Sequence, residues 1–190
     1  MPLVLPGCGL FELEEKRSRF IGYCMPISSE TDARQVIAQV AAEHPKANHN
    51  VYAYSISSSG IVRASDNGEP SGTAGVPVLN VFQKTGVIDF VCVVTRYFGG
   101  VMLGAGGLVR AYSKAAKGAL DAAGPQELII KTRHNITVPY SQLDQLKYKL
   151  EKLGADVLHI NYTTTCTLVV EVTQAQEKGL AAALETLRFG

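Results

Sequence analysis

The run VIDFVCVVTRYF, residues 87–98, is the feature that most constrains how this chain folds. It is nearly continuous in apolar and β-branched residues, which is typical of a strand buried on both faces. A glycine-rich segment, residues 99–107, follows directly, and a helical pattern then runs to a stop at Gly124-Pro125. We therefore expect a central strand, a glycine loop and a helix in succession.

The pattern of that helix places small and apolar residues on one face. Its expected apolar positions are Leu108, Ala111, Tyr112, Ala115, Ala119 and Ala122. Arg110, Lys114 and Lys117 fall at helical spacing on the opposite side. This helix therefore combines a packing face with a basic face.

Further elements are expected around the central strand. Alternation predicts a strand over 17–27, and capping residues followed by an apolar period predict a helix within 28–45. Segments 50–57 and 60–65 form a predicted hairpin, because both are rich in β-formers and a Ser-Gly turn joins them. Pro77 suits the first turn of a short helix that Gly86 ends.

The pattern changes near residue 130, beyond which strand, helix, strand, strand and helix follow in order. This is the split βαβ order of a ferredoxin-like domain that lacks only its last strand. We expect an α+β protein with two domains, residues 1–125 and 130–190, each with its own core.

Composition excludes several classes of function. Eighteen Lys and Arg residues against seventeen Asp and Glu residues leave a net charge of +1, so any charge-based recognition must be local. The four Cys and four His residues show no ligand spacing, which predicts a reduced, cytoplasmic chain without a structural metal or disulfide. We expect no cofactor, and no apolar run has the length of a membrane helix.

The chain has two glycine-rich stretches, the first at 66–75 and the second at 99–107. The second has the features of an anion site. A glycine loop before a helix exposes backbone N–H groups at the positive end of the helix dipole. Basic residues gather there, since between Asp89 and Asp121 the only charged residues are Arg96, Arg110, Lys114 and Lys117. The alternative is a tight turn for close packing with an ordinary solvated helix face, and neither a Walker A motif nor a dinucleotide fingerprint is present.

The first glycine stretch, DNGEPSGTAG at 66–75, is rich in turn residues. Ser71 and Thr73 are candidate caps for the helix entered at Pro77. Asp66 and Glu69 either belong to the turn or form a metal-binding or acid/base pair. His49 precedes a strand, and it is a candidate base or base-stacking group, or else a packing residue.

Four motifs carry a resemblance to a known family. They are KRSRFIGY at 16–23, HNVYAY at 49–54, SDNGEPSGTAGVPVL at 65–79 and VVTRYFGGVMLGAGGLVRAYSKA at 93–115. Together they resemble the YigZ/IMPACT family, and the bacterial YigZ branch is the closer match because it carries a second domain. The resemblance covers essentially the whole chain.

This resemblance implies an N-terminal domain with the fold of ribosomal protein S5 domain 2. It implies a ferredoxin-like second domain similar to domain V of elongation factor G. Eukaryotic IMPACT proteins regulate translation by competing within a protein complex that activates a starvation kinase. Met102 stands where the bacterial branch often has Lys, which weakens an anion-binding role for that side chain but leaves the glycine backbone intact. Val51 stands where the family often has Cys, so a catalytic thiol at that place is impossible.

The resemblance also implies a shared functional surface formed by both glycine stretches and their flanks. Its residues are His49, Asp66, Glu69, Arg96, Gly99, Gly100, Gly104, Gly106, Gly107 and Arg110. We expect one groove in which helix N-termini near Pro77 and Gly106 direct free N–H groups toward an anion, with Arg96 and Arg110 as partners.

Three functions fit this surface. The first is a non-enzymatic module that binds RNA, the ribosome or a translation-linked protein, with Lys114 and Lys117 extending the positive field. The second is a small-molecule enzyme that holds phosphate on the glycine loop, for which no complete magnesium-and-base constellation is evident. The third is a protein-interaction domain whose glycines are structural.

Overall fold

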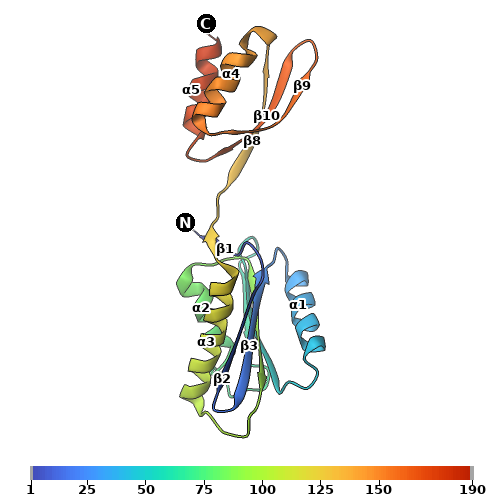
Figure 1. The fold of residues 1–190 in the computed structure, drawn as a ribbon, viewed down its shortest axis with the longest axis vertical. Coiled ribbons are helices and arrows are strands. Elements are labelled where there is room, and N and C mark those ends of the chain that lie inside the picture. The colour runs from blue at the N-terminus through green and yellow to red at the C-terminus, as the bar shows by residue number, and fades with distance from the viewer. Residues whose placement is uncertain (1, 189–190) are drawn as a thin grey trace. The chain divides into compact units, whose positions relative to one another are not determined.

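The computed structural model describes residues 2–188, drawn in Figure 1. Contacts divide the chain into two compact units, an N-terminal unit that ends at Leu128 and a C-terminal unit that begins at Ile129. The N-terminal unit extends past Gly124-Pro125 because strand β7 (Gln126–Glu127) pairs with strand β1 (Leu3–Val4).

An antiparallel five-stranded sheet forms the centre of the N-terminal unit, in the order β2-β3-β6-β4-β5. Its strands are β2 (Gly9–Glu15), β3 (Ser18–Pro26), β4 (His49–Ile56), β5 (Ile61–Ser65) and β6 (Phe90–Tyr97). The central position of β6 explains its apolar composition, because seven of its eight residues are buried. The predicted hairpin of β4 and β5 is also present.

Helices cover both faces of this sheet (Figure 1). Helix α1 (Glu30–Glu43) packs on β4 and β6, whereas α2 (Gly75–Thr85) and α3 (Ala105–Ala123) pack on the other face. The alternation of β6 side chains separates the two cores, since Val91 and Val93 face α1 while Cys92 and Val94 face the α2 and α3 side. The central strand β6 is thus buried on both faces, as predicted.

Two details differ from the expectations, whereas α2 begins at Gly75 and ends before Gly86, so that Pro77 lies in its first turn as predicted. Strand β2 had no predicted counterpart. Ala122 is exposed, while Ala116, Leu120 and Ala123 join the buried face of α3. The last turns of the helix therefore face the sheet through different residues from those expected.

The C-terminal unit has the predicted ferredoxin-like order. Its elements are β8 (Lys131–Val138), α4 (Tyr140–Leu153), β9 (Asp156–Tyr162), β10 (Cys166–Thr173) and α5 (Glu177–Arg188). The strands form an antiparallel sheet in the order β8-β10-β9. Leu146, Leu150 and Leu168 are fully buried in a core that is separate from the N-terminal cores. No helix within residues 2–188 combines the length and apolar character needed to cross a membrane.

Close packing of α3 on β2 and β3 depends on glycine at three contacts. A Cβ added at Gly22 would lie 2.5 Å from the carbonyl oxygen of Ala115, and Gly9 and Gly118 are equally closely covered. The helix backbone therefore rests directly on the sheet, which fixes where the N-terminus of α3 lies relative to β6.

We predict that Gly22→Ala destabilises the N-terminal unit by about 1–3 kcal/mol, because the added methyl group overpacks this contact. Gly7→Ala is the matched control, since a Cβ there meets no atom within 4 Å. Amide hydrogen exchange of β3 and α3 measures the unfolding of this unit. Equal protection in the two variants would contradict the packing account.

Candidate functional site

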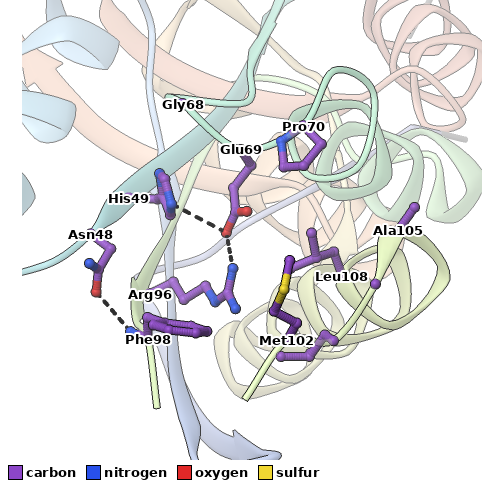
Figure 2. Close-up of a pocket in the computed structure, with 12 residues that line it drawn as sticks. Asn48, His49, Gly68, Glu69, Pro70, Arg96, Phe98, Met102, Ala105 and Leu108 are labelled. Carbon is purple, nitrogen blue, oxygen red and sulfur yellow. Dashed lines mark hydrogen bonds and ion pairs between the residues drawn. The ribbon is translucent and has the colours of Figure 1, made fainter. Parts of the chain in front are cut away.

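A groove of about 580 Å³ brings the two glycine-rich stretches together in the N-terminal unit (Figure 2). Gly68, Glu69 and Pro70 come from the first stretch, and the segment from Met102 to Ala105 comes from the second. The remaining lining residues are Asn48, His49, Arg96, Phe98 and Leu108. The expected convergence of the two stretches is therefore present in the geometry.

Strand pairing positions the polar side of the groove. His49 at the start of β4 is the cross-strand partner of Arg96 near the end of β6, so the sheet register places these side chains as neighbours. Just beyond the strand, the backbone N–H of Phe98 donates to Oδ1 of Asn48 at 2.8 Å. That bond holds the start of the glycine loop against β4.

A buried ion pair lies at the base of the groove. Arg96 and Glu69 are 5% and 9% exposed, and Nη1 of Arg96 donates to Oε1 of Glu69 at 2.6 Å. The Tyr112 hydroxyl donates to the same oxygen at 2.7 Å. Burial, together with this hydrogen bond to Glu69, raises the pKa of Tyr112, so the phenol stays a donor. Figure 2 shows His49, Glu69 and Arg96 pointing toward one another.

This pairing changes the role expected for Arg96. Its charge is neutralised by Glu69 rather than left free for an external anion. Its guanidinium lies 5.4 Å from the Phe20 ring centroid and 5.5 Å from that of Phe98, and Nη2 donates to Ser18 at 3.3 Å. Among the described residues, Nε of Arg96 is the one buried side-chain nitrogen or oxygen without a hydrogen-bond partner.

The tautomer of His49 follows from its hydrogen bond. Nδ1 lies 2.8 Å from the backbone oxygen of Asn67. Because a carbonyl oxygen only accepts, Nδ1 carries the hydrogen. Nε2 of His49 then has a lone pair in the neutral form, and it lies 3.8 Å from Oε1 of Glu69. In this tautomer His49 offers Nε2 to the groove as a hydrogen-bond acceptor.

Asp66 caps the N-terminal end of α2. This corrects the expectation that the helix N-terminus near Pro77 has free N–H groups and the expectation that Ser71 and Thr73 cap it. Its carboxylate accepts from the backbone N–H groups of Gly72 at 2.8 Å, Ala74 at 3.0 Å and Gly75 at 2.8 Å. The N–H groups of Ala74 and Gly75 at this end of α2 are therefore already occupied by a carboxylate of the same chain. Burial raises the pKa of Asp66, but these three donors outweigh it and hold the pKa below its usual value.

Ser71 and Thr73 do not cap this helix. Thr73 is buried, and its hydroxyl donates to the carbonyl oxygen of Pro70 at 2.6 Å, while Ser71 is exposed. Asp66 and Glu69 also have separate partners, the amides before α2 and the Arg96 guanidinium respectively. Across residues 2–188, no three His, Cys, Asp or Glu side chains gather in a way that could hold a metal ion.

The glycines of the second stretch have different tasks. A Cβ at Gly99 would collide with the carbonyl group of Arg17. Only glycine at this position therefore lets the chain run this close to the β2–β3 turn. Gly100 and Gly104 have φ angles of 83° and 73°, which disfavour other residues. At Gly107 a Cβ would lie 2.9 Å from that of Leu103. Backbone conformation explains Gly100 and Gly104, and close contacts explain Gly99 and Gly107.

Gly106 differs, because it leaves the first turn of α3 open. A Cβ there would meet only a terminal guanidinium nitrogen of Arg110, at 3.9 Å. Gly104 is the N-cap and supplies no side-chain hydrogen bond to the helix. The first turn of α3 therefore presents backbone N–H groups with the Arg110 guanidinium beside them.

A basic surface adjoins this turn, formed by Lys16, Arg110 and Lys114. These three line one hollow together with Glu15, Leu103, Gly107 and Ala111. Arg110 and Lys114 are exposed, and within residues 2–188 neither forms an ion pair with a carboxylate. Lys117 instead pairs with Asp121 at 2.5 Å, which reduces the contribution expected from it. Lys16 was missed as a site residue, although the motif at 16–23 contains it.

Comparison with known proteins identifies relatives along the whole chain. A model of the Impact N-terminal domain matches residues 16–120, and a domain of unknown function, DUF1949, matches residues 136–187. The IMPACT family member YvyE of Bacillus subtilis (strain 168) is 34% identical over 183 residues, covering 96% of this chain and 84% of that protein. YigZ of Escherichia coli (strain K12) is 32% identical over 191 residues, covering 98% and 94%.

Solved structures add a likeness of fold. A crystal structure described as that of a hypothetical protein is 31% identical and covers 96% of this chain and 90% of its own, with a TM-score of 0.64. The two-domain translational regulator Yih1 is 23% identical over 62% of this chain and 47% of that chain. Its TM-score is 0.41.

We predict that Asp66→Asn destabilises α2 at neutral pH, with a loss of about 1 kcal/mol that is typical of a helix cap. Because folding lowers the pKa of Asp66, its contribution is present above the unfolded-state pKa and is lost as pH falls through the folded-state pKa. The difference in urea midpoint between the two proteins should thus shrink in acid. Asp144→Asn, an exposed change on α4, is the control. A pH-independent difference would contradict the capping role.

We predict that Glu69→Gln destabilises the N-terminal unit by about 3–5 kcal/mol, because it leaves the Arg96 charge buried without a counter-charge. Glu12→Gln breaks an exposed pair with Arg19 and should cost far less. Urea unfolding followed by hydrogen exchange of β6 compares the two variants. Similar losses of unfolding free energy in the two variants would show that the buried Arg96–Glu69 pair stabilises the unit no more than the exposed Arg19–Glu12 pair does.

Proposed function

Because this chain belongs to the IMPACT family, we propose that it is a cytoplasmic, non-enzymatic regulator associated with translation. In this proposal the N-terminal unit binds single-stranded RNA, free or on the ribosome, through the basic surface and the first turn of α3. The recognised chemical group is the phosphate of the RNA backbone. The role in translation is the one that family resemblance implies.

The observation that carries this proposal is that Arg110 is exposed beside the first turn of α3 and pairs with no carboxylate among residues 2–188. Backbone N–H groups at a helix N-terminus and an adjacent guanidinium are a favourable combination for phosphate. Lys114 and Lys16 extend the positive charge along the same side. The buried Arg96–Glu69 pair contributes no net charge, so phosphate affinity depends on the surface groups.

The two carboxylates of the first glycine stretch, Glu69 in the groove and Asp66 at the start of α2, favour a binding role over catalysis. Asp66 is held by three amides, and Oε1 of Glu69 accepts from Arg96 and Tyr112. Each therefore has a structural task that fixes its position. Phosphoryl transfer needs a metal-binding acidic residue and a base near the phosphate, and we assign neither role to these two side chains.

We predict that the double variant Arg110→Glu/Lys114→Glu weakens binding of single-stranded RNA by at least about tenfold at low salt. The slope of log affinity against log salt should fall by about 0.7 for each phosphate contact that is lost. Fluorescence anisotropy with a labelled, unstructured RNA over a range of salt concentrations measures both quantities.

The matched control is Lys84→Glu/Lys178→Glu, which changes net charge equally at two exposed lysines outside the basic surface. It should retain both affinity and salt slope. Equal weakening in the two double variants would show that only overall charge matters. Unchanged binding in Arg110→Glu/Lys114→Glu would reject the proposed function.

A further inference from the structure

The groove beside α3 combines an apolar rim with hydrogen-bond donors, which phosphate recognition alone does not require. Phe98 is 47% exposed and Met102 is 83% exposed, although both are large apolar side chains. In Figure 2, Phe98 lies next to Arg96, and Met102 and Leu108 lie across the groove from His49. This apolar surface borders the same helix turn that presents its N–H groups.

We propose that the groove holds one unstacked nucleotide, with its base against Phe98 and Met102 and its phosphate on the first turn of α3. The inference rests on the proposed function and names the part of the RNA that the groove takes. An aromatic ring provides a stacking platform for any base, and single-stranded RNA offers bases that are free to leave the stack.

The phosphate end is defined by groups that carry positive charge or free N–H donors. Gly104 brings no capping side chain, and Gly106 leaves the turn uncovered except for the Arg110 guanidinium nearby. A phosphate at this turn accepts from backbone amides and pairs with Arg110. The basic surface then continues toward the next phosphate of a strand.

The part of the groove that would hold the base carries no net charge. Arg96 and Glu69 cancel each other's charge at 2.6 Å, so this part of the groove suits an uncharged planar ring rather than a second phosphate. Pro70, Leu103 and Leu108 add apolar lining. The groove volume of about 580 Å³ is within the usual range for small-molecule sites.

An unsatisfied donor is the second, independent sign of a ligand. Arg96 lines the groove and is only 5% exposed. Its Nε has no hydrogen-bond partner among residues 2–188. A buried donor without an acceptor is unfavourable, because burial has removed its hydrogen bond to water. Phe98 packs over this guanidinium at 5.5 Å, so a base that stacks on Phe98 in our proposal lies next to the side chain that carries this donor.

His49 adds an acceptor to the same end. With its hydrogen on Nδ1, the neutral ring turns the Nε2 lone pair toward the groove, beside Glu69. Exocyclic amino groups of adenine and cytosine donate to such an acceptor. The four bases should therefore bind with different affinities, unlike a site that recognises phosphate alone.

The test is isothermal titration of the full chain with the four nucleoside 5′-monophosphates, the matching nucleosides and inorganic phosphate. We expect at least one monophosphate to bind more tightly than both its nucleoside and phosphate. Phe98→Leu keeps an apolar side chain but removes the ring, and Met102→Ala changes a residue too exposed to be needed for folding. Each should weaken nucleotide binding by at least about fivefold.

Leu10→Ala is the matched control, because it removes a large exposed apolar side chain elsewhere in the unit. It should leave nucleotide binding unchanged. Competition with a four-nucleotide RNA distinguishes the source of the ligand: tighter binding of the RNA indicates a strand, and equal binding indicates a free nucleotide. Either result supports the nucleotide site.

Two outcomes overturn the inference, and each is distinguishable from failure of the proposed function. If no monophosphate exceeds inorganic phosphate while RNA still binds through Arg110 and Lys114, the groove takes no base but the proposed function stands. If Phe98→Leu instead abolishes a ribonuclease-resistant protein association and nucleotides do not bind, the apolar rim is a protein-docking surface. If nucleotides bind but charge reversal leaves RNA binding intact, the inference survives and the proposed function fails.

Discussion

The Arg96–Glu69 ion pair is the interaction on which the candidate site depends. It joins β6 to the first glycine stretch, and the Tyr112 hydroxyl adds α3 to the same carboxylate oxygen. Ser18 adds β3 through Nη2 of Arg96. Two buried charges are stable only when each is well paired, so this network fixes how the loop, the sheet and the helix meet. The groove has its shape because these parts converge on one pair of side chains.

The two glycine stretches serve that convergence in different ways. In the first, the turn wraps the backbone around the Asp66 carboxylate, which accepts hydrogen bonds from the N–H groups of Gly72, Ala74 and Gly75. In the second, Gly99 allows the chain to pass the β2–β3 turn, and Gly106 leaves the start of α3 open. At the start of α2 the amides of Ala74 and Gly75 are therefore occupied by Asp66, whereas no side chain caps the start of α3. This difference between α2 and α3 is what directs the proposed phosphate contact to a single place.

Local patterns predicted the elements better than their contacts. The apolar run of β6, the β4–β5 hairpin and the period of α3 each reflect neighbours in sequence, and each was predicted. Strand β2 was missed because it is an edge strand with few fully buried residues, so its composition is mixed. The Arg96–Glu69 pair spans 27 residues and the Asp66 cap spans up to nine. Such partners are set by the tertiary fold, so spacing showed charged residues without showing that they were already paired.

Ultraviolet cross-linking of the protein to RNA in living cells, followed by mass spectrometry of the adducts, tests the central claim most directly. Cross-links form at direct contacts between side chains and bases, so they report position rather than affinity. Our account predicts adducts within the segment from Phe98 to Arg110, with Phe98 or Met102 as principal sites. Adducts confined to the C-terminal unit, or an absence of adducts on the intact protein, would contradict it.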